Sequence, residues 1–212
     1  MGFWSGVCSF VSSVGSAIGS ALSGACSVVA SALSVLSSPL AQAVVVGIQI
    51  VANLLGIGTE EDKPEEIGMK VCRGEKKFED FESSEEYFKY LDGIQLGDDD
   101  LEELENPTKK AEYSVIGTTA YMQGINEKYG MNVPIDSYIR MVSMGIEKAE
   151  ELKEILDTYK QKEVEPNIEE AIKCELAPSE SKDIIGTLRE GIKKLEKSSE
   201  IMDRLDKMLD EM

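Results

Sequence analysis

The residues best suited to chemistry are carboxylates, concentrated in the run Asp98, Asp99, Asp100, Leu101, Glu102, Glu103, Leu104 and Glu105. Oxygen-rich loops of this kind bind hard cations such as Ca²⁺. An EF-hand loop beginning at Asp98 would need glycine at its sixth position, where Glu103 stands. We therefore interpret the run as a solvated helix start, where acidic side chains face the positive end of the helix dipole.

The sequence gives little evidence for a catalytic nucleophile, a zinc site or a cofactor site. The chain has no histidine, which excludes Ser-His-Asp and Cys-His nucleophiles and an imidazole-bearing zinc site. Its cysteines form no CxxC unit, and no glycine-rich phosphate loop occurs. The widely separated cysteines are Cys8, Cys26, Cys72 and Cys174. We predict reduced thiols, no catalytic residue, no metal site and no cofactor, and hence a non-enzymatic protein made in the cytoplasm.

Charge is distributed very unevenly along the 212 residues. The chain carries 40 acidic and 22 basic side chains, for a net charge of −18. Such a balance repels phosphate backbones, so sequence-independent nucleic-acid binding is not expected. Residues 1–59 contain no Asp, Glu, Lys or Arg, so every charge lies in residues 60–212. The sequence thus predicts an uncharged head and an acidic body.

The head has the period of an amphipathic helix without charges. Apolar residues recur at spacings of three and four from Phe3 to Leu36, and serines fill the opposite face. Glycines lie among the serines, and small residues let helices approach closely, as at small-xxx-small interfaces in membranes. The residues predicted to pack helices or anchor them at a membrane interface are Phe3, Trp4, Phe10, Gly15, Gly19 and Gly24.

Pro39 interrupts this pattern and is followed by a second, nearly uniform apolar run over residues 40–57. As a helix, eighteen residues reach about 27 Å, close to the roughly 30 Å of a bilayer core. Residues 1–58 are therefore predicted to form a hydrophobic helical hairpin. Two alternatives stay open: burial among protein subunits, which would suit the polar Gln42, Gln49 and Asn53, and a leader cleaved near Pro39.

The rest of the chain reads as an acidic linker over residues 59–82 and an acidic helical domain over residues 83–212. Helix starts are indicated at Ser83, Pro107, Pro134, Pro166 and Pro178. The helix after Pro134 is expected to run to about residue 160, and the last helix to span residues 181–211. Because strand-like alternation is nearly absent, the predicted fold class is all-α.

The long C-terminal helix shows a heptad pattern. Leu188, Leu195, Met202 and Leu209 are seven residues apart, and Ile185 and Ile192 precede two of them by three residues. The same register places Ser199 and Asp206 at seam positions. We therefore favour packing onto the body, or a contact with a partner, over a self-standing coiled coil. The predicted contact residues are Leu188, Ile192, Leu195, Met202 and Leu209.

An uncharged small-residue hairpin on an acidic helical body resembles, in architecture alone, membrane-inserting effectors, pore-forming toxins and phage ejection proteins. The favoured function is a membrane-active protein that forms homo-oligomers in a lipid membrane. Its body would keep it soluble or bind a protein carrier, chaperone or inhibitor until it reaches a target membrane. The alternatives are a structural component of a phage particle or secretion machine, with the head buried between subunits, and a constitutive membrane protein.

Overall fold

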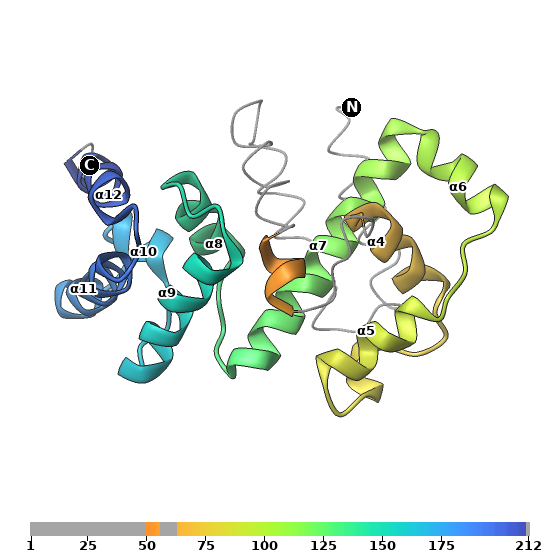
Figure 1. Cartoon of the computed structure of the whole chain (residues 1–212), viewed down its shortest axis with the longest axis horizontal. Coiled ribbons are helices and arrows are strands. Elements are labelled where there is room, and N and C mark those ends of the chain that lie inside the picture. The colour runs from red at the N-terminus through yellow and green to blue at the C-terminus, as the bar shows by residue number, and fades with distance from the viewer. Residues whose placement is uncertain (1–49, 56–62, 211–212) are drawn as a thin grey trace. The chain divides into compact units, whose positions relative to one another are not determined.

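The computed structural model describes residues 50–55 and 63–210, and in these residues it contains helices, turns and loops but no strand (Figure 1). The predicted all-α class is confirmed. No helix in the described ranges combines the length and apolar character needed to cross a membrane. Most of the head lies outside the described residues, including the segments predicted to form the serine-lined helix and the turn at Pro39.

The described residues fall into two compact units. The first comprises residue 55 and residues 63–128, and the second comprises residues 50–54 and 129–210. The single domain predicted over residues 83–212 is thus divided after Lys128. This division follows from packing rather than composition, since both parts are acidic and helical.

The first unit contains four α-helices and one short 3₁₀ helix. They are α4 (Pro64–Arg73), η1 (Phe78–Asp80), α5 (Ser84–Asp92), α6 (Asp98–Glu105) and α7 (Pro107–Tyr129), whose last residue belongs to the second unit. The Ser83 side chain caps α5 by accepting a hydrogen bond from the Glu86 backbone N–H, as its sequence position suggests. Helix α7 turns an apolar face to the core, where Tyr113, Ile116 and Ile125 are all buried.

Aromatic rings fill much of the core of the first unit. Phe88 stacks on Tyr121 with ring centroids 5.4 Å apart, and Tyr87 meets Phe78 edge to face at 5.0 Å. Such pairs stabilise a core beyond the area they bury. They join α5 to α7 on one side and to η1 on the other.

Besides the helical residues 50–54, the second unit contains five helices: α8 (Ile135–Ser143), α9 (Ala149–Lys162), α10 (Ile168–Ile172), α11 (Pro178–Lys193) and α12 (Ser198–Asp210). Helix α11 packs closely on α9, where a Cβ added to Gly191 would lie 3.2 Å from the Ile155 Cα atom. The buried Tyr159 hydroxyl donates to the Ile184 carbonyl oxygen at 2.9 Å. Burial raises the pKa of this phenol. It therefore stays neutral and keeps its proton for that bond.

Three expected segments differ from the structure. Residues 64–73 of the expected linker form α4, whose Ile67, Met69 and Val71 are buried. The helix expected from Pro134 to residue 160 is interrupted between α8 and α9, where Gly145 has a φ of +100°. An α-helix needs a φ near −60° at every residue, so it cannot continue through Gly145, and glycine tolerates the positive angle. Each difference divides or adds an element without changing the all-α class.

The expected helix over residues 181–211 is also divided, with α11 ending at Lys193 and α12 beginning at Ser198. One continuous helix would have placed the polar Ser199 and Asp206 on its apolar heptad face. The turn instead lets Ile201 and Leu205, one turn apart, become buried. Arg189 of α11 forms an ion pair with Asp206 of α12, which fixes the two helices against each other. A continuous coiled coil is therefore ruled out here.

Candidate functional site

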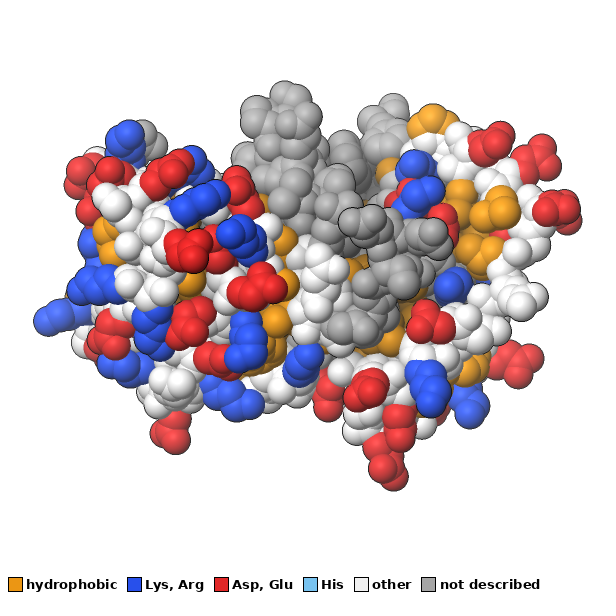
Figure 2. Space-filling model, viewed as in Figure 1, with side chains coloured by type: hydrophobic (Ala, Val, Ile, Leu, Met, Phe, Trp, Pro, Cys, Tyr) orange, Lys and Arg blue, Asp and Glu red, His pale blue; other side chains and the backbone are white. Residues whose placement is uncertain are grey.

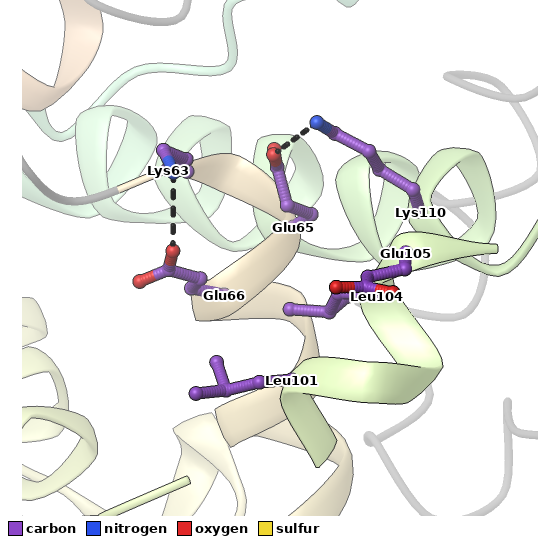
Figure 3. Close-up of a pocket in the computed structure, with 7 residues that line it drawn as sticks. All are labelled: Lys63, Glu65, Glu66, Leu101, Leu104, Glu105 and Lys110. Carbon is purple, nitrogen blue, oxygen red and sulfur yellow. Dashed lines mark ion pairs between the residues drawn. The ribbon is translucent and has the colours of Figure 1, made fainter. Parts of the chain in front are cut away.

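The candidate site is a groove in the first unit, which we call the α4–α6 groove. Its volume is about 400 Å³, within the range of pockets that bind small ligands. Figure 3 shows its lining from three segments: Lys63, Glu65 and Glu66 at the start of α4, Leu101, Leu104 and Glu105 from α6, and Lys110 from α7. Leu101 and Leu104 both point from α6 toward α4, so the groove has an apolar floor and charged edges.

Helix α4 is fixed in place by an unusually close contact with α7. A Cβ at Gly68 would lie 1.9 Å from the Tyr113 carbonyl oxygen, and a Cβ at Gly117 would lie 1.9 Å from the Pro64 carbonyl oxygen. Real Cβ atoms do not approach backbone so closely, so only glycine fits at both positions. This backbone contact sets the position of Glu65 and Glu66 at one edge of the groove.

Helix α6 is held mainly by charge, since none of its residues is buried. Its first turn is closed by the Asp100 carboxylate, which accepts a hydrogen bond from the Gly97 N–H at 3.0 Å. Arg73 of α4 then bridges two of its acids, pairing with Asp100 at 2.8 Å and Glu103 at 3.1 Å. The Tyr113 hydroxyl of α7 donates to Glu103 at 3.1 Å. The interpretation of the acidic run as an exposed helix start is confirmed.

The pKa shifts follow from these contacts. The Gly97 N–H bond, followed by the bond from Arg73, lowers the pKa of Asp100 below its usual value. Burial, reinforced by the neighbouring Glu103 carboxylate, raises the pKa of Tyr113. Asp100 is therefore ionised and Tyr113 neutral near pH 7, which are the states that their hydrogen bonds require.

The two edges of the groove differ electrostatically. On the α4 edge, Lys63 pairs with Glu66 at 3.7 Å and Lys110 pairs with Glu65 at 3.1 Å. On the α6 edge, Glu105 forms no ion pair with any described residue. The α4 edge is thus close to neutral, whereas the α6 edge keeps free negative charge. Figure 2 shows acidic side chains gathered over α6 beside hydrophobic ones.

This arrangement is suited to binding. Within the described ranges, no group of three or more His, Cys, Asp or Glu side chains is positioned to hold a metal ion. The groove can offer an apolar contact from two leucines and charge attraction from one edge. Those are the elements of a docking surface for a chain segment.

A second cavity, of about 590 Å³, lies in the second unit between α8, α10 and α12, where Arg140, Glu169, Lys173 and Met208 contribute to its lining. Arg140 holds Glu169 with two bonds, from Nε at 2.6 Å and Nη2 at 2.9 Å, and Lys173 lies 3.3 Å from the same carboxylate. Burial alone would raise the pKa of Glu169. These two cations outweigh that effect and hold the pKa below its usual range. The charges here are therefore already satisfied within the protein.

Of the two sets of residues predicted to make contacts, the structure describes only the set in the C-terminal helices. The head residues Phe3, Trp4, Phe10, Gly15, Gly19 and Gly24 lie outside the described residues. Of the predicted C-terminal contact residues, Leu188, Ile192 and Leu195 are buried in the second unit, whereas Met202 and Leu209 on the separate helix α12 are half-buried.

Sequence reasoning missed the residues that shape the groove. Leu101 and Leu104 stood inside the acidic run, and two leucines three residues apart were the available signal for an apolar helix face. No local pattern indicated Arg73 or Gly68, because their partners are 27 and more residues away. Comparisons with protein-family models, curated proteins and solved structures find no match to this chain.

Proposed function

We propose that this chain is a non-enzymatic membrane-inserting protein. Its uncharged head enters a lipid membrane and assembles there into a homo-oligomer or pore, while the acidic helical body stays in water and binds a protein partner. The observation that carries the proposal is the partition of charge: none in residues 1–59 and all 62 charged side chains beyond them. Charged residues are expensive in a bilayer core, so only the head is suited to enter it.

The described residues of the body support separate roles for the head and the body. Helix α4 begins at Pro64, five residues after the head, and is locked to α7 by the Gly68 and Gly117 contact. The helix that follows the head in the sequence is therefore firmly packed on the body. Movement of the head does not require α4 to leave its place.

The end of the second apolar run is packed in protein in the described structure. Residues 50–55 are helical, Ile50, Val51 and Leu54 are buried, and Asn53 is exposed. Fully burying an aliphatic side chain contributes about 1.5–3 kcal/mol. Three such side chains would hold this segment by about 5–9 kcal/mol. Insertion of the whole run must therefore be compensated by lipid, which supports triggered rather than spontaneous exposure.

The chain offers a direct reporter for head insertion. Trp4 is its single tryptophan, so intrinsic tryptophan fluorescence reports on the head alone. We expect a blue shift and quenching by brominated lipid when neutral vesicles are added, together with release of trapped dye. Vesicles with anionic lipid should bind less well, because the body is strongly acidic. Unchanged Trp4 fluorescence with every vesicle would refute the proposal.

Oligomer packing is tested by Gly15→Ile with Gly19→Ile. If helices associate through this face, dye release should fall to background, while the shift in Trp4 fluorescence persists. The matched control is Gly186→Ile in α11, where an added Cβ meets no atom within 4 Å. Full leakage by the double variant would remove these glycines from the mechanism.

A second function, a structural component of a particle or secretion machine, is favoured by Gln42, Gln49 and Asn53, polar side chains of the apolar run that suit burial among protein subunits better than contact with lipid. It predicts rings or tubes in vesicle-free solution, visible by electron microscopy, and no dye release. The membrane proposal predicts leakage instead. The two outcomes are read in the same purified sample.

A further inference from the structure

The side of α6 that lines the groove carries an exposed apolar side chain beside carboxylates that no described residue pairs with. Leu101 is 47% exposed and is the one large hydrophobic side chain exposed to this degree in the described part of the chain. Asp98, Glu102 and Glu105 surround it on the same short helix, and no ion pair with a described residue holds any of them. This face is therefore neither packed nor neutralised.

The composition around α6 strengthens this asymmetry. Residues 78–105 contain twelve acidic side chains and one lysine. Within α6, Asp98 and Glu102 are one turn apart, and like charges at this spacing destabilise a helix. A cation placed beside these acids would relieve that repulsion. The carboxylates on the α4 edge of the groove are already neutralised, because Lys63 and Lys110 pair with them.

We propose that the α4–α6 groove docks a basic amphipathic helix of a partner protein. An apolar side chain of that helix lies against Leu101 and Leu104, and a lysine or arginine lies beside Glu102 and Glu105. Apolar anchors at helical spacing are how grooves recognise helices, and charge complementarity fixes their orientation.

The same charges disfavour the other occupants. The head of this chain has no basic residue with which to match the α6 edge. Anionic lipid headgroups would be repelled by it, and a second copy of the chain would bring a further net charge of −18. A basic partner helix is the occupant that satisfies both the leucines and the acids.

This inference rests on the part of the proposed function that gives the body a protein partner. Its failure can be distinguished from failure of the membrane function. Peptide binding is measured without lipid, and dye release is measured without peptide.

The test uses the full chain and a fluorescein-labelled helical peptide whose leucines recur at i, i+3, i+4 and i+7, with lysines elsewhere. We expect saturable binding by fluorescence anisotropy at physiological salt, and slower amide exchange in residues 98–105 when the peptide is bound. A peptide of identical composition with scrambled order separates groove recognition from general attraction to an acidic protein. It should bind about tenfold more weakly or worse.

Two variants locate the binding. Leu101→Gln should weaken binding of the ordered peptide about tenfold, because it removes a central apolar contact. The pair Glu102→Gln with Glu105→Gln should weaken it several-fold. The matched pair Glu180→Gln with Glu196→Gln, exposed acids of the second unit, should leave it unchanged. Circular dichroism checks that each variant is folded.

The proposal is overturned if the ordered and scrambled peptides bind equally, or if Leu101→Gln and the Glu180/Glu196 pair have equal effects. It is also overturned if the peptide does not bind and Leu101→Gln instead abolishes self-association in sedimentation, which would make a second copy the occupant. Loss of vesicle flotation in Leu101→Gln without peptide binding would make lipid the occupant.

Discussion

In the first unit, α4 and α7 meet with backbone against backbone at Gly68 and Gly117, whereas in the second unit α8 and α10 are joined by the paired side chains of Arg140 and Glu169. The first contact leaves no room for any side chain. The second depends on two long side chains meeting in a partly buried place. One junction is therefore sensitive to added volume, and the other to removed charge.

The units also differ in how they hold their peripheral helices. Helix α6 has no buried residue and is held by Arg73, Tyr113 and a half-buried Leu104. Helix α12 instead buries Ile201 and Leu205 and adds an ion pair from Arg189 to Asp206. Because apolar burial is insensitive to salt and exposed ion pairs are screened by it, α6 is the element more easily displaced. The proposed docking groove thus lies beside the less firmly held helix.

The largest effect is expected from adding one methyl group to the α4–α7 contact. Gly68→Ala or Gly117→Ala should lower the free energy of unfolding by about 3 kcal/mol or more, because backbone must move to admit the Cβ. Urea unfolding followed by circular dichroism measures this loss. Gly186→Ala is the control, since its Cβ meets nothing within 4 Å; it should stabilise by about 0.5–1 kcal/mol. Equal effects at the three glycines would contradict the close contact.

A smaller loss should follow when charge is removed from the other junction. Arg140→Met leaves the buried Glu169 carboxylate with only Lys173 and should cost about 2 kcal/mol in the free energy of unfolding. Arg189→Met, in the same unit, breaks a more exposed pair and should cost no more than about 1 kcal/mol. The same urea experiment compares them. A smaller loss for Arg140→Met than for Arg189→Met would mean that the α8–α10 junction does not depend on its ion pair.

Lowering the pH should weaken the contact between Arg140 of α8 and Glu169 of α10. The pKa of Glu169 is lower in the folded protein than its usual value of 4.5, so its stabilising contribution is fully present above pH 4.5. That contribution is lost as pH falls through the lowered pKa, because the unfolded chain takes up the proton first. Urea midpoints between pH 6 and pH 3 should fall less steeply in Arg140→Met than in the unaltered protein. Identical slopes would show that Arg140 does not set this pKa.

Local sequence signals predicted the helices that are delimited by their own residues. Ser83 caps α5 and Pro107 begins α7, as their positions indicated, and Gly130 follows the end of α7. Helix α4 was missed because it begins with Pro-Glu-Glu, which is equally typical of a solvated linker. Its burial depends on Gly117, forty-nine residues beyond Gly68, and no local pattern reveals such a pairing.

The candidate site was predictable in its charge and not in its shape. The acidic run indicated an exposed helix start, which α6 confirms. The exposure of Leu101 depends on how α6 is turned by Arg73, a contact between residues 27 positions apart. The break between α11 and α12 was similarly hidden, because heptad spacing is satisfied by Leu188 and Leu195 even though the helix ends between them.

The smallest effect is expected at the ion pairs that hold α6. Arg73→Gln removes both pairs but leaves the Gly97 cap and Leu104 in place. Since the arginine is largely exposed, global stability should fall by no more than about 1 kcal/mol. The local effect is sharper, because amide exchange in residues 98–105 should accelerate several-fold while α5 and α7 keep their protection. Lys162→Gln, which removes an exposed pair between α9 and α11, is the control, and α11 should keep its protection there because it is held by burial. Equal acceleration of α6 and α11 would show that the two units hold their outer helices alike.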